Sequence, residues 1–558
     1  MKQNKKEVIL ILMVLMAVVL FFILYVDLGR RTTSEKIVEN KDIYERDNSI
    51  YDVYISVFPT KDDAGNILDF SAFSQCTSKN RTYYNPTLDC NVQILNEGEA
   101  PDLKKDIDHK NATIRVRGGS TRSAEYKSYK VKLENNTEPF FGQTNLNINK
   151  HTQDSYKIAT KLQTDLLADM DDIFSYRTYF MRVWIKDVSL PEEEQEFQYH
   201  GLYTEVEQPN EDYLRARGFG KKAVMYKANN FAFGLSDKLR NVDDPQYNKE
   251  EFETVLRIQS GNSHEKLLEM LTAVNDMSLD FEKVFQTYFD EDNYLTWLAF
   301  NLLMGNEDVI SHNYIFFSPA ESKTWYFLPW DFDGALDFEK YKDTWNHRLS
   351  LRSIQGFNMS VLHRRYFRLE GSIEKLQKKM KELLNEVITK EKVTALVDSY
   401  KGVLGKILFT PSDVEQIDMT MQELGVSLAS LYEGMEGCYE LYKENILYPA
   451  PMFVAKPEKQ EDGSLRFAWD SSYSYQGLPI TYKVEVFDAA MNGPIFWQEG
   501  IEDTSWILRE ELEPGVYFVR VSAIDSEGHE QIDFEHFIGQ LVDGRETNVY
   551  GLLEFRIE

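Results

Sequence analysis

The first hydrophobic feature of the chain is a single unbroken apolar run. Residues 8–26 supply 19 apolar positions in a row, and at about 1.5 Å per residue such a helix crosses a hydrocarbon core of about 30 Å. Lys2, Lys5 and Lys6 precede the run and favour a cytoplasmic N-terminus over residues 1–7. We therefore expect a signal anchor. A cleaved secretory signal is the alternative, although no small-x-small cleavage motif follows.

Either alternative places the rest of the chain outside the cytoplasm. No second apolar run of that length occurs in the sequence, so the anchor predicts a cell-membrane protein that crosses the bilayer once. Residues 27–48 are polar and weakly patterned, which is typical of a juxtamembrane stalk.

Beyond the stalk, the period of the pattern changes along the chain. Apolar residues first alternate with polar ones, as in strands, and later recur every three or four positions, as in helices. Strand-like segments are 51–58, 90–95, 112–118, 126–133, 178–187 and 200–208, helical ones are 156–170, 267–277, 281–289, 293–305, 372–388 and 426–446, and a strand pair at 314–318 and 324–330 lies among the helices. This order predicts an α+β domain over residues 49–447, with a β-rich lobe before a helical lobe. Kinase-like folds have this layout, and so do other α+β chains.

The last part of the chain, residues 448–558, has a different pattern. A proline break precedes short strands at the spacing of a β-sandwich, with Trp469 as a core residue on an early strand. The segment from Leu512 to Tyr517 resembles the corner that precedes a late strand in fibronectin type III domains. We expect a fibronectin type III-like sandwich that serves as a spacer or adhesion module.

Charge and composition narrow the class of protein. The 558 residues carry a formal net charge of −29, and the hydrophobic share is 42%. The hydrophobic share is that of a folded chain. A surface this acidic repels nucleic-acid backbones, so we expect no nucleic-acid partner.

Cysteine is too rare for a disulfide-built scaffold, with three residues in the whole chain. Cys76 and Cys90 lie close in sequence and are candidates for one disulfide, with Cys438 left over. Three buried thiols are the equally open alternative, and the spacing does not fit a metal site.

The residues with chemical potential lie between 304 and 338. Asp308 follows a hydrophobic helix, Asn313 begins an apolar strand, and the next strand ends at Asp331, two positions before Asp333. A hairpin brings these strand ends together, which would place the three side chains around one point. Phosphoryl transfer needs one carboxylate near the acceptor hydroxyl, and an amide oxygen with another carboxylate to hold Mg²⁺.

The same residues resemble a known family. The pattern Asn306-x-Asp308-x3-His312-Asn313 followed by residues 329–334 (PWDFDG) is similar to the core of the CotH family, the spore-coat-protein-H-like secreted kinases. Residues 117–121 (RGGST), 127–133 (KSYKVKL) and 201–207 (GLYTEVE) resemble further elements of that family. The resemblance implies an atypical protein-kinase fold that uses ATP and Mg²⁺ or Mn²⁺ to phosphorylate Ser or Thr of a protein.

The resemblance also implies roles for individual residues at the acidic end of the site. Asp308 would orient the acceptor as the catalytic base. Asn313 and Asp331 would be metal ligands, with Asp333 as a second metal ligand or a supporting group. His312 would orient the Asp308 loop or form only a local hydrogen bond.

On the nucleotide side, Lys127 is the first candidate. It shares a strand face with Tyr129 and Val131, so we expect it to point inward, where a phosphate would compensate its burial; Lys132, on the other face, is the second candidate. Arg117 begins a turn whose backbone could approach phosphates. Glu207 (with Glu205) is a candidate partner of Lys127, and an exposed strand of alternating charge is the alternative.

Three functions fit these observations. The first is a membrane-anchored kinase that acts on a spore-coat or cell-surface protein, or on itself. The second is a non-catalytic scaffold at the cell surface, built on a kinase-like domain. The third is a metal-dependent hydrolase, which is disfavoured because such sites use His or bridging carboxylates and only nine His are scattered along the chain.

Overall fold

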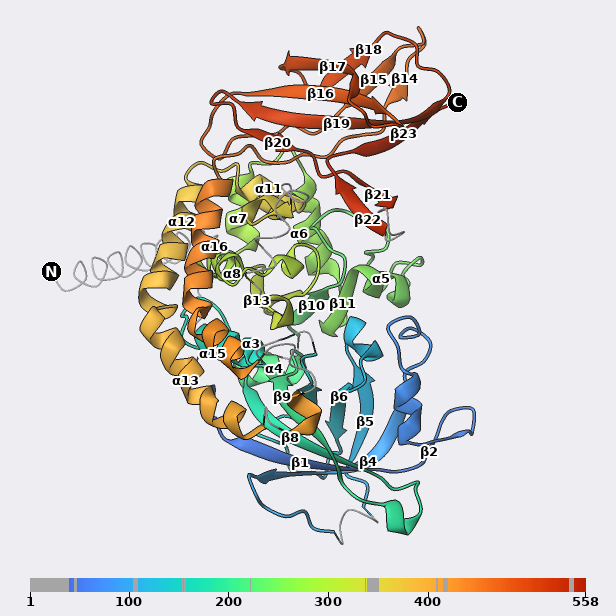
Figure 1. The fold of residues 1–558 in the computed structure, drawn as a ribbon, viewed down its shortest axis with the longest axis vertical. Helices are drawn as coiled ribbons and strands as arrows, with labels where there is room; N and C mark the ends of the chain where they lie inside the picture. The colour runs from blue at the N-terminus through green and yellow to red at the C-terminus, as the bar shows by residue number, and fades with distance from the viewer. Residues whose placement is uncertain are drawn as a thin grey trace, which may run out of the picture.

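The computed structural model describes residues 40–44, 48–103, 109–152, 154, 157–220, 222–336, 338, 351–407, 410–414, 420–540 and 546–558. The anchor predicted at residues 8–26 and most of the stalk lie outside this part of the chain. Within it, none of the helices has the length and apolar content needed to cross a bilayer. Figure 1 shows a strand-rich unit at one end of the molecule, a second at the other, and helices between them.

The first unit is a closed barrel. Its strands are, in spatial order, β1 (Ile50–Val57), β4 (Thr87–Asn96), β5 (Ala112–Arg117), β6 (Ser128–Leu133), β7 (Asn145–Asn149), β9 (Gln198–Glu207) and β8 (Thr178–Asp187). Alternate apolar residues such as Val53, Val131 and Tyr203 fill the interior. The opposite faces of β5 and β6 are therefore turned outward, and they carry arginine and lysine. A small hairpin of β2 (Thr60–Lys61) and β3 (Ile67–Leu68) lies beside the barrel.

The middle of the molecule combines helices with an antiparallel sheet. The sheet order is β11 (Leu256–Ser260), β10 (Val224–Ala228), β12 (Tyr314–Ser318) and β13 (Tyr326–Pro329). The predicted strand pair is thus the β12–β13 hairpin, extended by two strands that the pattern did not reveal. The helices are α3 (Ala159–Leu167), α4 (Glu211–Ala216), α5 (Lys249–Val255), α6 (Glu265–Asn275), α7 (Phe281–Tyr288), α8 (Glu291–Leu303), α10 (Ile354–Phe357), α11 (Val361–Tyr366), α12 (Ser372–Glu382), α13 (Lys390–Ile407), α14 (Pro411–Val414), α15 (Met421–Ala429) and α16 (Leu431–Asn445).

The main core holds these elements together. Helix α8 is buried on nearly all sides and packs against β13, α12 and α16. Its residues Trp297 and Leu298 belong to one large apolar cluster that also includes the sheet residues Phe316 and Phe327. The mixed helix and strand content predicted for this domain is confirmed.

The C-terminal unit is a two-sheet sandwich. One sheet has the order β14 (Glu458–Lys459), β15 (Leu465–Ala468) and β18 (Ser505–Leu508), and the other has β17 (Pro494–Ile501), β16 (Ile480–Asp488), β19 (Gly515–Asp525) and β20 (Glu530–Ile532), with β23 (Leu553–Ile557) also on β19. Trp469 lies in the shared core, as expected. The Tyr517 hydroxyl donates to the carbonyl oxygen of Glu513 at 2.8 Å, the contact of a tyrosine corner. The likeness to fibronectin type III domains stays a prediction. A separate ribbon, β21 (His536–Gln540) and β22 (Glu546–Tyr550), projects from the sandwich.

The segment at residues 40–44 is fastened to the junction between the barrel and the helices. The Lys41 ammonium donates to the carbonyl oxygens of Met170 and Ile173, at 2.6 and 3.2 Å. The Tyr44 hydroxyl donates to the carbonyl oxygen of Ser175 at 3.0 Å, and the Arg217 guanidinium lies 5.3 Å from the Tyr44 ring. This short segment, which we call the N-terminal strap, is therefore part of the folded body.

Candidate active site

The loop that follows α8 holds Asp308. Gly305 has a φ of +63° and ends the helix, and the Asn306 backbone N–H donates to the carbonyl oxygen of Asn301 at 2.9 Å. Asp308 then lies in the 3₁₀ turn η5 (Glu307–Val309), with its side chain 47% exposed. The loop is thus anchored on the helix side and presents Asp308 outward.

Two neighbours fix the Asp308 carboxylate. His312 Nε2 lies 2.8 Å from Oδ1, and the Asn313 amide donates to Oδ2 at 2.6 Å. Burial alone would raise the pKa of Asp308, but these two hydrogen bonds lower it. The hydrogen bond to Asp308 in turn raises the pKa of His312. Asp308 is therefore held as an oriented carboxylate, and His312 contacts it directly.

The β12–β13 hairpin brings the second acidic segment to the same place. Tyr314 pairs with Pro329 at the open end of the hairpin, so Asn313 before β12 and Asp331 after β13 are neighbours. Both take left-handed backbone conformations, with φ of +57° and +65°. A Cβ at Gly334 would lie 3.5 Å from Cβ of Asp308. The structure thus brings together the residues predicted to meet at this point.

Asp333 is a half-buried member of the acidic group. Burial raises the pKa of Asp333, and the neighbouring Asp331 carboxylate raises it further, to about 8. Its turn, η6 (Phe332–Gly334), rests on α3, where the Gln163 amide donates to the carbonyl oxygen of Phe332 at 3.1 Å. Two carboxylates held this close repel each other, and a divalent cation between them would remove the repulsion.

The side chains at this place could supply only a few ligands to a magnesium-type ion. Among the described residues, no group of three or more His, Cys, Asp or Glu side chains is arranged to hold a metal. Asn313, Asp331 and Asp333 offer an amide and two carboxylates, all hard oxygen donors. Mg²⁺ needs one or two protein carboxylates when phosphates and waters supply its other ligands, so this set fits a metal that arrives with a phosphate.

Cations lie close to the acidic group. Lys227, half-buried on β10, places Nζ 3.6 Å from Oδ2 of Asp331, and burial lowers its pKa. Burial also lowers the pKa of Arg117, at the end of β5, to about 10, although Asp331 and Asp333 act in the opposite direction. Arg117 was predicted here, whereas Lys227 was missed because the pattern gave no strand at β10.

Three more cations extend this group, two on the outer face of the barrel and one on β11. Lys130 Nζ donates to Oε1 of Gln208 at 3.0 Å. Burial, together with the neighbouring Arg115 and Arg117, lowers the pKa of Lys130 to about 8. Arg257 on β11 adds to the positive charge around both Arg115 and Lys130. We call Arg115, Arg117, Lys130, Lys227 and Arg257 the cleft cations.

Strand parity contained the signal that could have identified Lys130. Lys127 does point inward, as predicted. In a closed barrel, however, the inward direction leads to the end of the barrel and not to the acidic group. There its Nζ donates to the carbonyl oxygens of Cys76 and Arg122, at 3.1 and 2.7 Å. Lys132 shares the outward face with Lys130 but is exposed. The structure therefore groups Lys130, and not Lys127, with the other cleft cations.

Glu207 is part of a closed ion-pair cluster. Arg177 Nη2 and Arg217 Nη2 lie 2.6 and 3.0 Å from its two carboxylate oxygens, and its side chain is 2% exposed. Glu205 is buried as well, and the Gln143 amide donates to it at 3.3 Å. The expectation of an exposed strand with alternating charge is wrong, because these positions face the barrel interior. The structure gives neither glutamate a contact with Lys127.

The predicted disulfide is not formed in the structure. Cys76, after η2 (Phe70–Gln75), and Cys90, on β4, are both free and fully buried in the barrel core. Cys438 on α16 is also a free buried thiol. Burial raises the pKa of all three thiols, so the alternative of three buried thiols describes them.

Comparison with known proteins identifies the class of this site. The profile described as CotH kinase protein matches residues 114–418, a range that contains Asp308, Asp331 and the cleft cations. The domain is therefore of the kinase-like class. Because the match covers more than half of the chain, the chain belongs to the CotH kinase protein family.

Two individual proteins are similar to this chain. The inner spore coat protein H of Bacillus subtilis (strain 168) is 23% identical over 314 residues, which are 55% of this chain and 81% of that protein. The crystal structure of the Helicobacter pylori proinflammatory kinase CtkA matches with a TM-score of 0.27 and 11% identity over 59% of this chain and 93% of that chain. A TM-score this low does not define the fold of the chain.

Proposed function

We propose that this protein is a kinase that transfers the γ-phosphate of ATP to Ser or Thr of a protein, using Mg²⁺ or Mn²⁺. The observation that carries the proposal is the meeting of Asp308, Asn313 and Asp331 at one end of the β12–β13 hairpin, opposite the cleft cations. Phosphoryl transfer depends on positioning and on charge stabilisation around the phosphates, and this arrangement offers both.

The acidic residues have separate roles in this proposal. Asp308 orients the acceptor hydroxyl and takes its proton, because its carboxylate is exposed and fixed by hydrogen bonds from its two neighbours. Asn313 and Asp331 would hold the metal, and Asp333 would support them from below. When bound, the metal neutralises phosphate charge and aligns the γ-phosphate with the acceptor.

The cleft cations bind the phosphates on the opposite side. Lys227 and Arg117 lie nearest Asp331 and would meet the transferred phosphate. Lys130, Arg115 and Arg257 extend away from the acidic group and would hold the rest of the triphosphate. Burial, together with neighbouring positive charges, lowers the pKa values of Arg115, Arg117, Lys130 and Lys227, and an anionic ligand would relieve this repulsion.

The test uses the full-length chain with γ-labelled ATP and Mg²⁺ or Mn²⁺, and measures label transfer to a basic protein and to the chain itself. Asp331→Asn is expected to lower kcat/KM at least about 10³-fold, about 4 kcal/mol of transition-state stabilisation. Glu321→Gln, at the exposed turn of the same hairpin, is the matched control and should match wild type. Wild-type activity in Asp331→Asn contradicts the proposal. A folded wild type that neither transfers label nor binds Mg·ATP favours the scaffold function.

Location and substrate are part of the proposal. The apolar run at residues 8–26 supports a single-pass cell-membrane anchor, with the kinase domain outside the cytoplasm. The similarity to an inner spore coat protein supports a spore-coat or cell-surface protein as the acceptor. Membrane pellets washed with alkaline carbonate should retain the chain, and a variant lacking residues 8–26 should be released. Release of the intact chain would contradict the anchor.

A further inference from the structure

We propose that the C-terminal sandwich positions the Asp308 loop, acting through helix α10. The sandwich was expected to be a spacer or adhesion module, but its loop at residues 470–475 is docked on the helices that neighbour the site. The proposal concerns the kinase site described above and rests on the proposed function for its activity readout only. Its structural readout is independent of catalysis.

The docking begins with two arginines of the helical part. Arg364 Nη1, on α11, lies 2.8 Å from Oδ2 of Asp470. Arg368 Nη2 donates to the carbonyl oxygen of Ser471 at 2.5 Å, and its guanidinium lies 4.8 Å from the Tyr473 ring. These contacts hold the sandwich loop against α11 and present two tyrosine hydroxyls to α10.

A continuous chain of buried and partly buried hydrogen bonds then crosses the junction. The Tyr473 hydroxyl donates to Oδ1 of Asn358 at 2.5 Å, and the Asn358 amide donates to the Tyr475 hydroxyl at 2.6 Å. Tyr475 donates to Oε1 of Gln355 at 2.9 Å, and the Gln355 amide donates to the carbonyl oxygen of Asn445, on α16, at 2.9 Å. Gln355 and Asn358 are 0% exposed, so water cannot replace a lost partner without a rearrangement.

Helix α10 touches the Asp308 loop directly. A Cβ at Gly356 would lie 2.5 Å from Cδ1 of Ile310, the residue two positions after Asp308. The helix therefore packs closely on the Ile310 side chain. A displacement of α10 would move Ile310, and with it the turn that carries Asp308.

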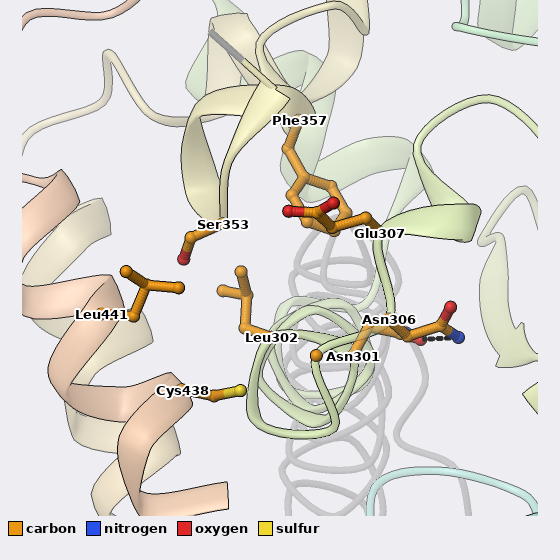
Figure 2. A pocket seen from close by; sticks show the side chains of 9 residues that line it. Asn301, Leu302, Asn306, Glu307, Ser353, Phe357, Cys438 and Leu441 are labelled. Atoms are coloured by element: carbon orange, nitrogen blue, oxygen red, sulfur yellow. Dashed lines mark hydrogen bonds between the residues drawn. The ribbon is translucent and has the colours of Figure 1, made fainter. Parts of the chain in front are cut away.

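The pocket in Figure 2 marks where these parts meet. It is lined by Ser353 and Phe357 from the α10 side, Gly305 and Glu307 from the loop, and Cys438 and Leu441 from α16. The two helices joined by the Gln355 hydrogen bond are thus the same two that flank the loop. The loop is therefore backed by α10 and α16, and the sandwich holds α10 through the tyrosine hydrogen bonds described above.

The experiment uses the full-length chain and three single variants. Tyr475→Phe removes the hydroxyl that links Asn358 and Gln355. Tyr517→Phe is the matched control, because its hydroxyl bonds only within the sandwich in the described contacts. Ile310→Ala removes the contact between α10 and the loop. Hydrogen exchange of the backbone amides at 305–313 is measured for each variant, with kcat and the KM for Mg·ATP.

We expect Tyr475→Phe to raise exchange at 305–313 about tenfold and to lower kcat about tenfold, with the KM for Mg·ATP within twofold of wild type. Tyr517→Phe should change neither quantity. In the Ile310→Ala background, Tyr475→Phe should have less than a twofold further effect, because the connecting contact is already lost. A role in stability alone would raise exchange throughout the domain and would leave the two substitutions additive.

Several results would overturn the proposal. They are unchanged exchange at 305–313 in Tyr475→Phe, an equal change in Tyr517→Phe, or full additivity with Ile310→Ala. Asp470→Asn weakens the same docking from the surface and is expected to raise exchange at 305–313 two- to threefold. If Tyr475→Phe fails to fold, the result for Asp470→Asn tests the proposal in its place. If the wild type transfers no phosphate, the proposed function fails, and the exchange results alone still test the positioning role.

Discussion

Two groups of charged residues in this molecule contrast with each other. Around Glu207, two arginines and a backbone N–H saturate one buried carboxylate. Around Asp331, carboxylates lie beside one another, and the Lys227 ammonium is 3.6 Å away. The first group is complete within the protein, whereas the second would gain from a metal ion and phosphates. The difference separates a structural ion-pair cluster from a candidate ligand site, although both contain motif residues of the same family.

The largest effect expected from this contrast is on stability. Glu207→Gln leaves Arg177 and Arg217 without their carboxylate in a buried place, which should lower the free energy of unfolding by about 3–5 kcal/mol. Glu211→Gln, in an exposed ion pair 3.7 Å long, is the control and should cost at most about 0.5 kcal/mol. Urea denaturation of both variants measures the difference. A small loss for Glu207→Gln would mean that the cluster does not stabilise the fold.

The stability that the Glu207 cluster contributes depends on pH in a predictable direction. Burial alone would raise the pKa of Glu207, but the two guanidinium groups lower it below its usual value. A carboxyl with a lowered pKa in the folded state contributes stability above its unfolded pKa, and loses it as the pH falls through the folded pKa. The difference between wild type and Glu207→Gln should therefore shrink in acid.

The second prediction separates the two faces of β6. Lys130→Met should weaken Mg·ATP binding about tenfold, or about 1.4 kcal/mol, because it removes a cation from the cleft. Lys127→Met should leave the affinity unchanged, because Lys127 Nζ is held by two carbonyl oxygens at the end of the barrel. Titration calorimetry of both variants decides between the two lysines. A loss of affinity in Lys127→Met alone would restore the assignment made from the sequence.

Lys130 also predicts a pH dependence of binding. Its pKa of about 8 means that the free protein loses this positive charge as the pH rises through 8. The apparent affinity for Mg·ATP should therefore fall above that pH. Lys130→Arg keeps the charge and should bind with nearly the same affinity from pH 7 to 9.

The smallest expected effect is stabilisation by the metal alone. At five times its dissociation constant, a cation that binds only the folded protein raises the free energy of unfolding by about 1 kcal/mol. Mg²⁺ should give this gain in wild type and none in Asp331→Asn, as measured by thermal unfolding. An equal gain in both proteins would place the cation elsewhere.

The sequence predicted the acidic half of the site better than the cationic half. Asp308, Asn313 and Asp331 are local to one helix and one hairpin, so their meeting follows from short-range pattern. The cleft cations come from β5 and β6 of the barrel and from β10 and β11 of the separate sheet. Their meeting depends on how the barrel packs against that sheet, which alternation alone does not encode. Lys127 shows the consequence, because the inward face was correctly chosen but was not the face of the cleft.

Local pattern also missed two details of the fold. Residues 426–446 read as one helix, whereas the structure ends α15 at Ala429 and begins α16 at Leu431. Closeness in sequence suggested a bond between Cys76 and Cys90, but neighbouring positions in a chain do not fix the geometry that a disulfide needs. Both features are set by tertiary packing.

The N-terminal strap would limit the distance between the folded domain and the proposed membrane anchor. If residues 8–26 span the bilayer as proposed, fourteen residue steps separate Val26 from Asn40, or about 50 Å at full extension. Because Lys41 and Tyr44 are fastened to the junction of barrel and helices, the tether ends there. The folded domain would then stay within a thin layer next to the membrane, and an acceptor protein would have to enter that layer to be phosphorylated.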